Sequence, residues 1–266
     1  MTQHKTVNAC LILIGNELLS GRTQDKNLSY IAKELNELGI QLARAHVIPD
    51  EKEIIVKYLN KCRQDYDYVF TTGGIGPTHD DITSECVAEA FGVPMVRDPE
   101  TAALMTKRVE ERGEVMNEAR LRMATFPKGS TLLPNSISAA PGYCMENVFV
   151  MAGVPRVMRV MFEEAKGYLT GGSKVNSRGL AIDLGEGTIA DALETIQNKY
   201  PELDIGSYPQ MRHEVGFRVS VVIRGREDGQ LDKAHAEIMQ ALLDLGGNPR
   251  DEDPNTAQAS AEPGDA

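Results

Sequence analysis

"YDYVFTTGGIGPTHDDITSECVAEAFG" (Tyr66–Gly92) decides the fold, because it joins an apolar run to a helix-like segment through a glycine-rich loop. The apolar run predicts a buried strand, and the segment after the loop has helical spacing up to Gly92. Glycines after a strand let backbone N–H groups approach an anion, and the next helix adds its positive N-terminus. The stretch therefore predicts a strand–loop–helix unit that binds a phosphorylated ligand. The predicted ligand-binding loop residues are Gly73, Gly74, Gly76, Pro77 and Thr78.

The same alternation of strand and helix patterns runs through the first two-thirds of the chain. Strands are predicted at 7–15, 40–48, 66–74, 131–134 and 147–153, and helices at 27–39, 50–64, 81–92, 99–113, 117–126 and 154–169. Such alternation is typical of an open parallel sheet with helices on both faces. The predicted fold class is therefore α/β, with a three-layer αβα architecture and a mostly parallel sheet.

A domain boundary is predicted at "TGGSK" (Thr170–Lys174), where small residues interrupt the pattern. The first domain should span residues 5–169. Residues 173–246 follow as a small α+β domain with the order βαββα. Residues 247–266 have almost no apolar content and are predicted to form a disordered acidic tail.

The composition excludes several classes of protein. The chain has 41% hydrophobic and 25% charged residues, as globular proteins do, and its net charge is −11. Because the sequence has no long basic stripe, nucleic acid is not an expected partner. The apolar run at the N-terminus is too short to span a membrane, so a cytoplasmic protein without a membrane partner is predicted. Because no C-x-x-C pair occurs, neither structural zinc nor a disulfide is expected, and four reduced, mostly buried thiols are predicted.

The glycine loop does not match the two best-known phosphate-binding motifs. A P-loop needs G-x-x-x-x-G-K-[ST], and the loop has no such lysine. A dinucleotide fingerprint needs G-x-G-x-x-G, but Gly76 is followed by Pro77, Thr78 and His79. A plain tight turn is the alternative interpretation of these glycines.

Carboxylates accompany the glycines at the ends of the predicted strands. One of Asp80 and Asp81 is expected to cap the following helix, since Asp is a favoured N-cap. The other is surplus to capping and makes sense beside a phosphate if Mg²⁺ lies between them. Asp50 ends the second strand, expected to lie next to the third, and could alternatively cap helix 51–64. Glu17 follows Gly15 at the end of the first strand and could alternatively be an exposed loop residue.

Four motifs in order resemble a known family. "IGNELLSGRTQDKN" (Ile14–Asn27), "VIPDEKEI" (Val47–Ile54), "TTGGIGPTHDDIT" (Thr71–Thr83) and "SAAPGY" (Ser138–Tyr143) resemble the molybdenum-cofactor-biosynthesis, or molybdopterin-binding, domain. The closest resemblance is to the N-terminal half of the competence/damage-inducible protein A (CinA) family. Residues 173–246 resemble the small KH-like domain of CinA proteins, whose C-terminal deamidase domain has no counterpart in this sequence.

The resemblance implies a function and a set of site residues. It implies binding of a phosphorylated pterin or nucleotide of the molybdopterin, ADP-ribose or FAD type, metal-dependent hydrolysis of a diphosphate bond, and a homo-oligomer. Asp50 and Asp81 correspond to essential aspartates of related enzymes. The expected metal ligands are Asp50, Asp80 and Asp81, with Mg²⁺, Mn²⁺ or Co²⁺. Further expected ligand-binding residues are Gly15, Glu17, Thr83, Ser138 and Gly142.

The sequence also departs from the family pattern. Relatives read G-T-E where this chain has Gly15-Asn16-Glu17, and L-P-G-P-P-x-E where it has Met151–Val157, so that two prolines and a glutamate are missing. Two functions therefore compete: a metal-dependent pyrophosphatase-type hydrolase, and a non-catalytic molybdopterin- or nucleotide-binding protein. The aspartates favour the first and the missing glutamate favours the second. RNA binding by the small domain is not expected, because acidic Glu186 lies between its nearest glycines.

Overall fold

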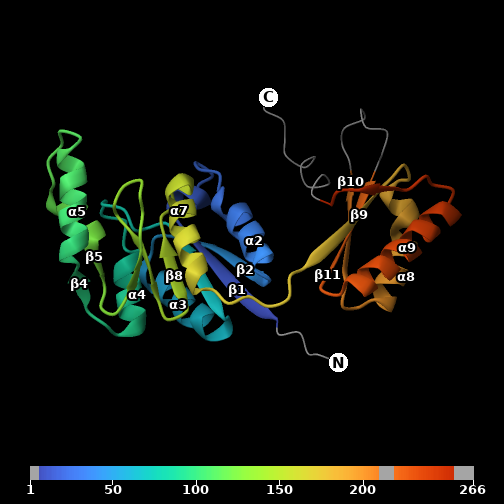
Figure 1. Ribbon diagram of the computed structural model, residues 1–266, viewed down its shortest axis with the longest axis horizontal. Coiled ribbons are helices and arrows are strands. Elements are labelled where there is room, and N and C mark those ends of the chain that lie inside the picture. The colour runs from blue at the N-terminus through green and yellow to red at the C-terminus, as the bar shows by residue number, and fades with distance from the viewer. Residues whose placement is uncertain (1–5, 210–218, 255–266) are drawn as a thin grey trace. The chain divides into compact units, whose positions relative to one another are not determined.

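The computed structural model describes residues 6–209 and 219–254, and the chain divides into two compact units (Figure 1). The first unit comprises Met1–Ser173 and the second Lys174–Ala266. The division falls inside the Thr170–Lys174 segment in which the sequence predicts a boundary.

The first unit is built on a six-stranded sheet. Its strands lie in the order β2-β1-β3-β8-β7-β6. Strands β1, β2, β3 and β8 are parallel, whereas β7 runs antiparallel to both of its neighbours. The prediction of a mostly parallel sheet is confirmed. The bounds are β1 (Val7–Ile14), β2 (Ile40–Ile48), β3 (Tyr68–Thr72), β6 (Thr131–Leu133), β7 (Gly142–Met145) and β8 (Val148–Met151).

The strand order corrects one expectation, because β1 lies between β2 and β3. The second strand is therefore not adjacent to the third. The chain reverses its winding direction here, so the crevice between the ends of β1 and β3 is a topological switch point. Ligands of open α/β sheets bind at such points.

Helices cover both faces of this sheet (Figure 1). On one face, α2 (Asn27–Glu37) and α7 (Pro155–Ala165) form an apolar core with Leu11 and Leu13 of β1. On the other face, α3 (Lys52–Asp65) and α4 (Thr83–Phe91) pack against Cys10 and Ile12 of the same strand. Alternate residues of a strand point to opposite faces, so a continuous apolar run supplies both cores. The three-layer αβα architecture is confirmed.

The segment between α4 and β6 differs from the prediction. Helix α5 (Pro99–Glu110) forms as expected, but the helix predicted at 117–126 is only one turn, α6 (Glu118–Leu121), followed by the 3₁₀ turn η1 (Arg122–Ala124). The chain then continues as β5 (Thr125–Pro127), which pairs antiparallel with β4 (Met95–Arg97). Tertiary pairing thus replaces the last helical turns, and it places two arginine-bearing segments side by side.

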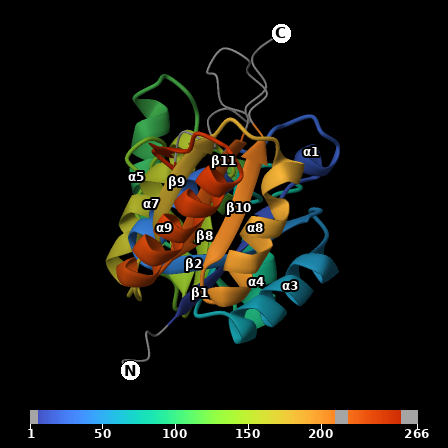
Figure 2. The same cartoon turned by 90° about the vertical axis from the view of Figure 1, so that its right-hand side faces the viewer.

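The second unit is a four-stranded antiparallel sheet in the order β10-β11-β9-β12. Helices α8 and α9 pack against its strands (Figure 2). The βαββα order is as predicted, but β12 makes the prediction of a disordered tail from residue 247 wrong for 250–252; residues 255–266 lie outside the described residues. The bounds are β9 (Asn176–Ile182), α8 (Glu186–Lys199), β10 (Asp204–Pro209), β11 (Val219–Gly225), α9 (Asp228–Asp244) and β12 (Arg250–Glu252).

Strand β12 is held by polar contacts that a hydropathy pattern does not reveal. Ser220 donates to Glu252 at 2.6 Å, and the Asn248 N–H donates to Asp183 at 2.9 Å. A Cβ on Gly179 would lie 2.6 Å from the Glu252 carbonyl oxygen, so the two strands approach closely.

The longest helix of the described ranges, α9, has 17 residues, and no helix in those ranges is long and apolar enough to cross a membrane.

Candidate functional site

Five loops meet at the carboxyl edge of the main sheet. The loops at 15–26, 49–51, 73–82 and 152–154 follow the parallel strands β1, β2, β3 and β8, and the short helix α1 (Asn16–Leu19) lies in the first of them. Because β7 is antiparallel to β8, the 134–141 loop that enters β7 reaches the same edge. The structure thus brings the predicted site segments, which are far apart in sequence, to one end of the sheet.

Close packing explains the first two glycines of the loop after β3. Gly73 has φ 104°, and a Cβ there would lie 2.1 Å from the Ile14 carbonyl oxygen. Gly74 has φ 67°, and a Cβ there would lie 2.2 Å from Thr83 Oγ1. The buried Thr83 hydroxyl donates to the Gly73 carbonyl at 3.0 Å. Thr83, predicted to bind the ligand, therefore supports the loop, and its hydroxyl hydrogen is already used.

Asp81 closes the second half of the loop. Its Oδ2 accepts hydrogen bonds from the Thr78 N–H, at 2.8 Å, and from the Thr78 hydroxyl. A Cβ on Gly76 would lie 2.6 Å from this oxygen, so the carboxylate needs a glycine beneath it. The N-cap of α4 is Ile82, without a side-chain cap bond. The expectation that Asp80 or Asp81 caps this helix was wrong, because Asp81 turns back to Thr78 and Asp80 is exposed.

Asp50 connects the loops after β2 and β1. Its Oδ2 accepts from the Asn16 N–H at 2.8 Å, at the first residue of α1. The N-cap of α3 is Glu51, so the alternative in which Asp50 caps that helix was wrong. The exposed Glu17 carboxylate folds over Gly15, where a Cβ would lie 2.5 Å from Glu17 Oε1.

The strand order separates the predicted metal ligands. Neighbouring strands lie about 4.8 Å apart, so the axes of β2 and β3 are roughly 10 Å apart with β1 between them. Within residues 6–209 and 219–254, the only three His, Cys, Asp or Glu side chains with ligand atoms within 4.8 Å of one another are Cys10, His46 and Cys62. Asp50, Asp80 and Asp81 therefore do not form a prepared three-carboxylate metal site.

The loop before β7 contains two further predicted residues. Ser138 is exposed at the edge, and its hydroxyl oxygen accepts from Asn135 Nδ2 at 2.7 Å. Gly142 is buried in the sheet, and a Cβ there would lie 2.6 Å from the Val150 carbonyl oxygen. Ser138 thus lies at the edge that carries the other loops, whereas close packing accounts for Gly142.

A cavity of about 210 Å³ opens beside the glycine loop. Gly76 and Asp81 contribute from the loop, and Arg97 of β4 and Arg122 of η1 contribute two guanidinium groups. Arg97 forms an ion pair with Glu118 at 2.9 Å, and Arg122 donates to the Pro77 carbonyl. Neither arginine was predicted as a site residue from the sequence, because both reach the loop only through the pairing of β4 with β5. Their one signal in the sequence was a position outside the apolar core pattern.

Tyr143 lines this cavity and carries a buried polar atom. Its side chain is 1% exposed, and its hydroxyl has no hydrogen-bond partner among the residues described. Burial raises the pKa of Tyr143, and the nearby Ser84 hydroxyl lowers it by a smaller amount. The geometry between the two hydroxyl groups does not meet the criteria for a hydrogen bond. A buried hydroxyl without a partner costs free energy, which a ligand oxygen could recover.

The loop after β8 packs against the glycine loop. A Cβ on Gly153 would lie 3.4 Å from the Gly73 Cα, and buried Asn27 donates to the Gly153 carbonyl at 2.8 Å. Val157, at the position where the family pattern predicts a glutamate, is half-buried and packs against the core shared by α2 and α7. The segment keeps its packing role without the family's acidic side chain.

Comparisons with known proteins agree with this architecture. Residues 10–170 match the family model "Probable molybdopterin binding domain", and residues 174–246 match "FAD synthase, middle domain". A protein of Archaeoglobus fulgidus is 32% identical over 234 residues, which are 88% of this chain and 97% of that protein. A CinA-like protein of Trichormus variabilis is 32% identical over 80% of this chain, which spans 54% of that relative. The crystal structure of the protein CinA from Thermoplasma acidophilum has 30% identity and a TM-score of 0.56, covering 61% of this chain and 98% of that one.

Proposed function

Since this chain belongs to the molybdopterin-binding domain family, with a CinA-like N-terminal domain, we propose that it binds a phosphorylated pterin or nucleotide at the carboxyl edge of its main sheet. The site lies at the switch point between β1 and β3, where ligands of open α/β sheets bind. The glycine loop would supply backbone N–H groups, and the loop at Gly15 would border the ligand from the other side.

The observation that carries the proposal is the pair of guanidinium groups beside the loop. Arg97 and Arg122 line one cavity with Gly76, and Tyr143, whose buried hydroxyl has no partner among the described residues, lines it too. Guanidinium groups bind phosphate oxygens with charge-assisted, often bidentate hydrogen bonds. They supply the positive charge that the Asp81 and Glu85 carboxylates of the same lining make necessary.

Size and family place limits on the ligand. The cavity of about 210 Å³ is smaller than the roughly 300–1,000 Å³ typical of small-molecule pockets. We therefore assign it to the phosphate-bearing part of the ligand, with the ring system outside it along the loop edge. The match of residues 174–246 to the middle domain of FAD synthase favours a nucleotide diphosphate such as FAD or ADP-ribose beside the molybdopterin alternative.

A second candidate function is hydrolysis of the ligand's diphosphate bond with a divalent cation. It is favoured by Asp81, which with Glu85 lines the cavity beside the two arginines, because simple anion capture does not need a carboxylate. The three aspartates do not fit a prepared cation site, so no catalytic step is assigned to a metal. A cation such as Mg²⁺ would have to arrive with the ligand, where it would neutralise phosphate charge.

Calorimetric titration with ADP-ribose and with FAD, each in Mg²⁺ and in EDTA, tests both functions. Binding in EDTA by wild type and Asp81→Asn, without turnover in Mg²⁺, Mn²⁺ or Co²⁺, supports the binding protein. Release of nucleoside monophosphate, detected by ion-exchange chromatography and lost in Asp81→Asn, supports the hydrolase. Asn keeps a carbonyl oxygen to accept from Thr78, so the loop should survive the substitution. No binding of either nucleotide or of a molybdopterin would refute the assignment of this site.

A further inference from the structure

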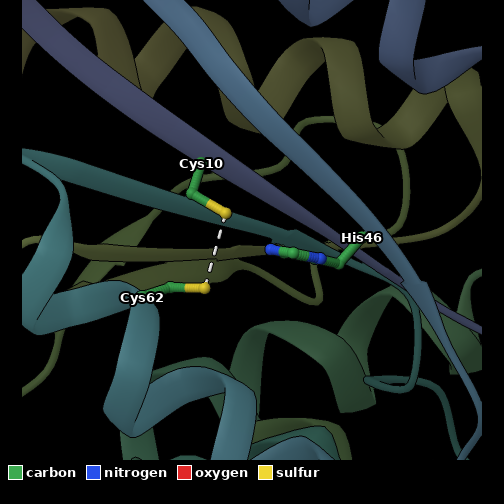
Figure 3. A group of neighbouring side chains, drawn as sticks. All are labelled: Cys10, His46 and Cys62. Carbon is green, nitrogen blue, oxygen red and sulfur yellow. Dashed lines mark hydrogen bonds between the residues drawn. The ribbon is translucent and has the colours of Figure 1, made fainter.

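A second cluster of chemically reactive side chains lies away from the loop edge. Cys10 of β1, His46 of β2 and Cys62 of α3 converge between the sheet and α3 (Figure 3). One nitrogen of His46 and the two sulfurs lie within 4.8 Å of one another, and the Cys10 thiol lies 3.4 Å from the Cys62 sulfur. The two cysteines are buried and the imidazole is half-buried. Three separate elements thus place two sulfurs and a nitrogen around one point.

The spacing suits a tetrahedral metal ion. Zn²⁺ binds thiolate at about 2.3 Å and imidazole at about 2.0–2.1 Å, so two thiolates on one tetrahedral zinc lie roughly 3.8 Å apart. The observed 3.4 Å separation of the sulfurs needs only a small adjustment. Figure 3 shows the edge of the His46 ring directed toward the two sulfurs. Two thiolates also cancel the charge of a divalent ion, which lowers the cost of burying it.

The surroundings favour a fixed geometry. His46 packs against Tyr58 with ring centroids 4.8 Å apart, which orients the imidazole. Its strand β2 is at the edge of the sheet, so the half-buried ring lies on the solvent side of the two buried thiols. The charged groups that act on the cluster are Arg44 and Lys61 near His46, and Asp65 near both thiols.

We propose that Cys10, His46 and Cys62 form a binding site for a thiophilic divalent cation, Zn²⁺ in the first instance, with a fourth position open to water. The site is independent of the proposed pterin or nucleotide site, because its ligands lie under the sheet and not in the edge loops. The sequence rule that excluded zinc looks for cysteines close together in the chain. It fails here because β1, β2 and α3 each supply one ligand.

Two simpler roles for these cysteines compete with the proposal. Cys10 and Cys62 could be core residues whose thiols share a hydrogen bond and do nothing else. Cys86 and Cys144 are buried free thiols of this kind. Alternatively, an added disulfide oxidant could join Cys10 to Cys62, since their sulfurs are already close. Neither role needs His46, so the imidazole distinguishes a metal site from both.

The experiment titrates Co²⁺ and then Zn²⁺ into the tag-free, reduced full chain. Absorption reports on cobalt because thiolate ligands give an intense near-ultraviolet charge-transfer band that carboxylate ligands do not. We expect one equivalent of Co²⁺ to produce this band, Zn²⁺ to abolish it, and Zn²⁺ to raise the melting temperature. His46→Gln and Cys62→Ser should each weaken zinc binding at least about tenfold. Loss of a residue that only hydrogen-bonds to a metal ligand already lowers metal affinity by about tenfold or more, and these two residues are proposed as ligands themselves.

Matched controls keep the test decisive. Cys86→Ser and Cys144→Ser remove buried thiols outside the cluster and should leave cobalt and zinc binding unchanged. Because Cys62→Ser could disturb the core, the half-buried His46→Gln variant carries the argument, provided that its melting temperature in EDTA equals that of wild type. Absence of the charge-transfer band in wild type, or an unchanged band in folded His46→Gln, would overturn the proposal.

Discussion

The contact between Gly74 and Thr83 yields a prediction whose size follows from the structure. In Gly74→Ala, the new methyl group would lie 2.2 Å from Thr83 Oγ1, at a residue with φ 67°. The left-handed backbone costs a non-glycine residue about 1–2 kcal/mol. Displacing the Thr83 hydroxyl also breaks its buried bond to Gly73, at about 1–3 kcal/mol. We therefore expect Gly74→Ala to lower the free energy of unfolding by about 2–5 kcal/mol.

Gly92→Ala is the matched control, because Gly92 has nearly the same φ, 65°, but no packing neighbour among the described residues lies within 4 Å of the position that a Cβ would take. It should cost only the backbone term, about 1–2 kcal/mol. Urea denaturation of both variants, of Thr83→Ala and of Gly74→Ala/Thr83→Ala completes a double-mutant cycle. The double variant should be less destabilised than the sum of the single ones, since one hydrogen bond is lost in both. Equal losses in Gly74→Ala and Gly92→Ala, or strict additivity, would show that Thr83 does not hold the loop.

Three further outcomes are expected. Arg122→Met should weaken pyrophosphate binding about tenfold or more, because a charge-assisted hydrogen bond contributes roughly 1.5–3 kcal/mol. Calorimetry should show unchanged pyrophosphate affinity for Arg159→Met, on α7. Equal losses of affinity in the two variants would mean a nonspecific charge effect. Tyr143→Phe should leave the free protein as stable or more stable by about 1 kcal/mol in urea denaturation, while ligand affinity falls, because the variant removes a buried hydroxyl without a partner; a large loss of stability would reveal a missed partner. Lys166→Met should cost up to about 1 kcal/mol at pH 7. Lys166 forms an ion pair with Glu163 and holds the pKa of that carboxyl below its usual value. The ion pair therefore stabilises the fold above pH ~4.3, and this stabilisation is lost as acid protonates Glu163. The difference in unfolding free energy between Lys166→Met and wild type should accordingly be smaller at pH 3 than at pH 7.

The long periodic elements could be predicted from the sequence because their signals are local. The apolar run of β1 and the stripe containing Ile31 and Leu35 in α2 read directly as a buried strand and a one-sided helix. Glycine at position 92 marked the end of α4, and the structure has it as the left-handed C-cap. These features depend on neighbours within one or two turns of chain.

The features that the sequence did not predict depend on distant partners. The order β2-β1-β3 follows from the packing of whole strands, and it places β1 between the strands that precede Asp50 and Asp81. Strands β4 and β5 have three residues each, too few for a periodic signal, yet their pairing carries Arg97 to the site. The capping rule failed at Asp81 because the Asp81 carboxylate accepts two hydrogen bonds from Thr78 instead. Local rules therefore located the glycine loop but not its cationic partners.

The hydrogen bonds that brace the edge loops have a consequence for the kinetics of association. Asp50 ties α1 to the loop after β2, Asp81 ties the glycine loop to itself, and Thr83 anchors the loop's first carbonyl. A ligand that meets loops already in place does not have to order them, so little of its binding energy is spent on conformational entropy. In stopped-flow mixing, the observed rate should rise linearly with ligand concentration in a single phase. A rate that levels off would instead reveal a closing step after encounter.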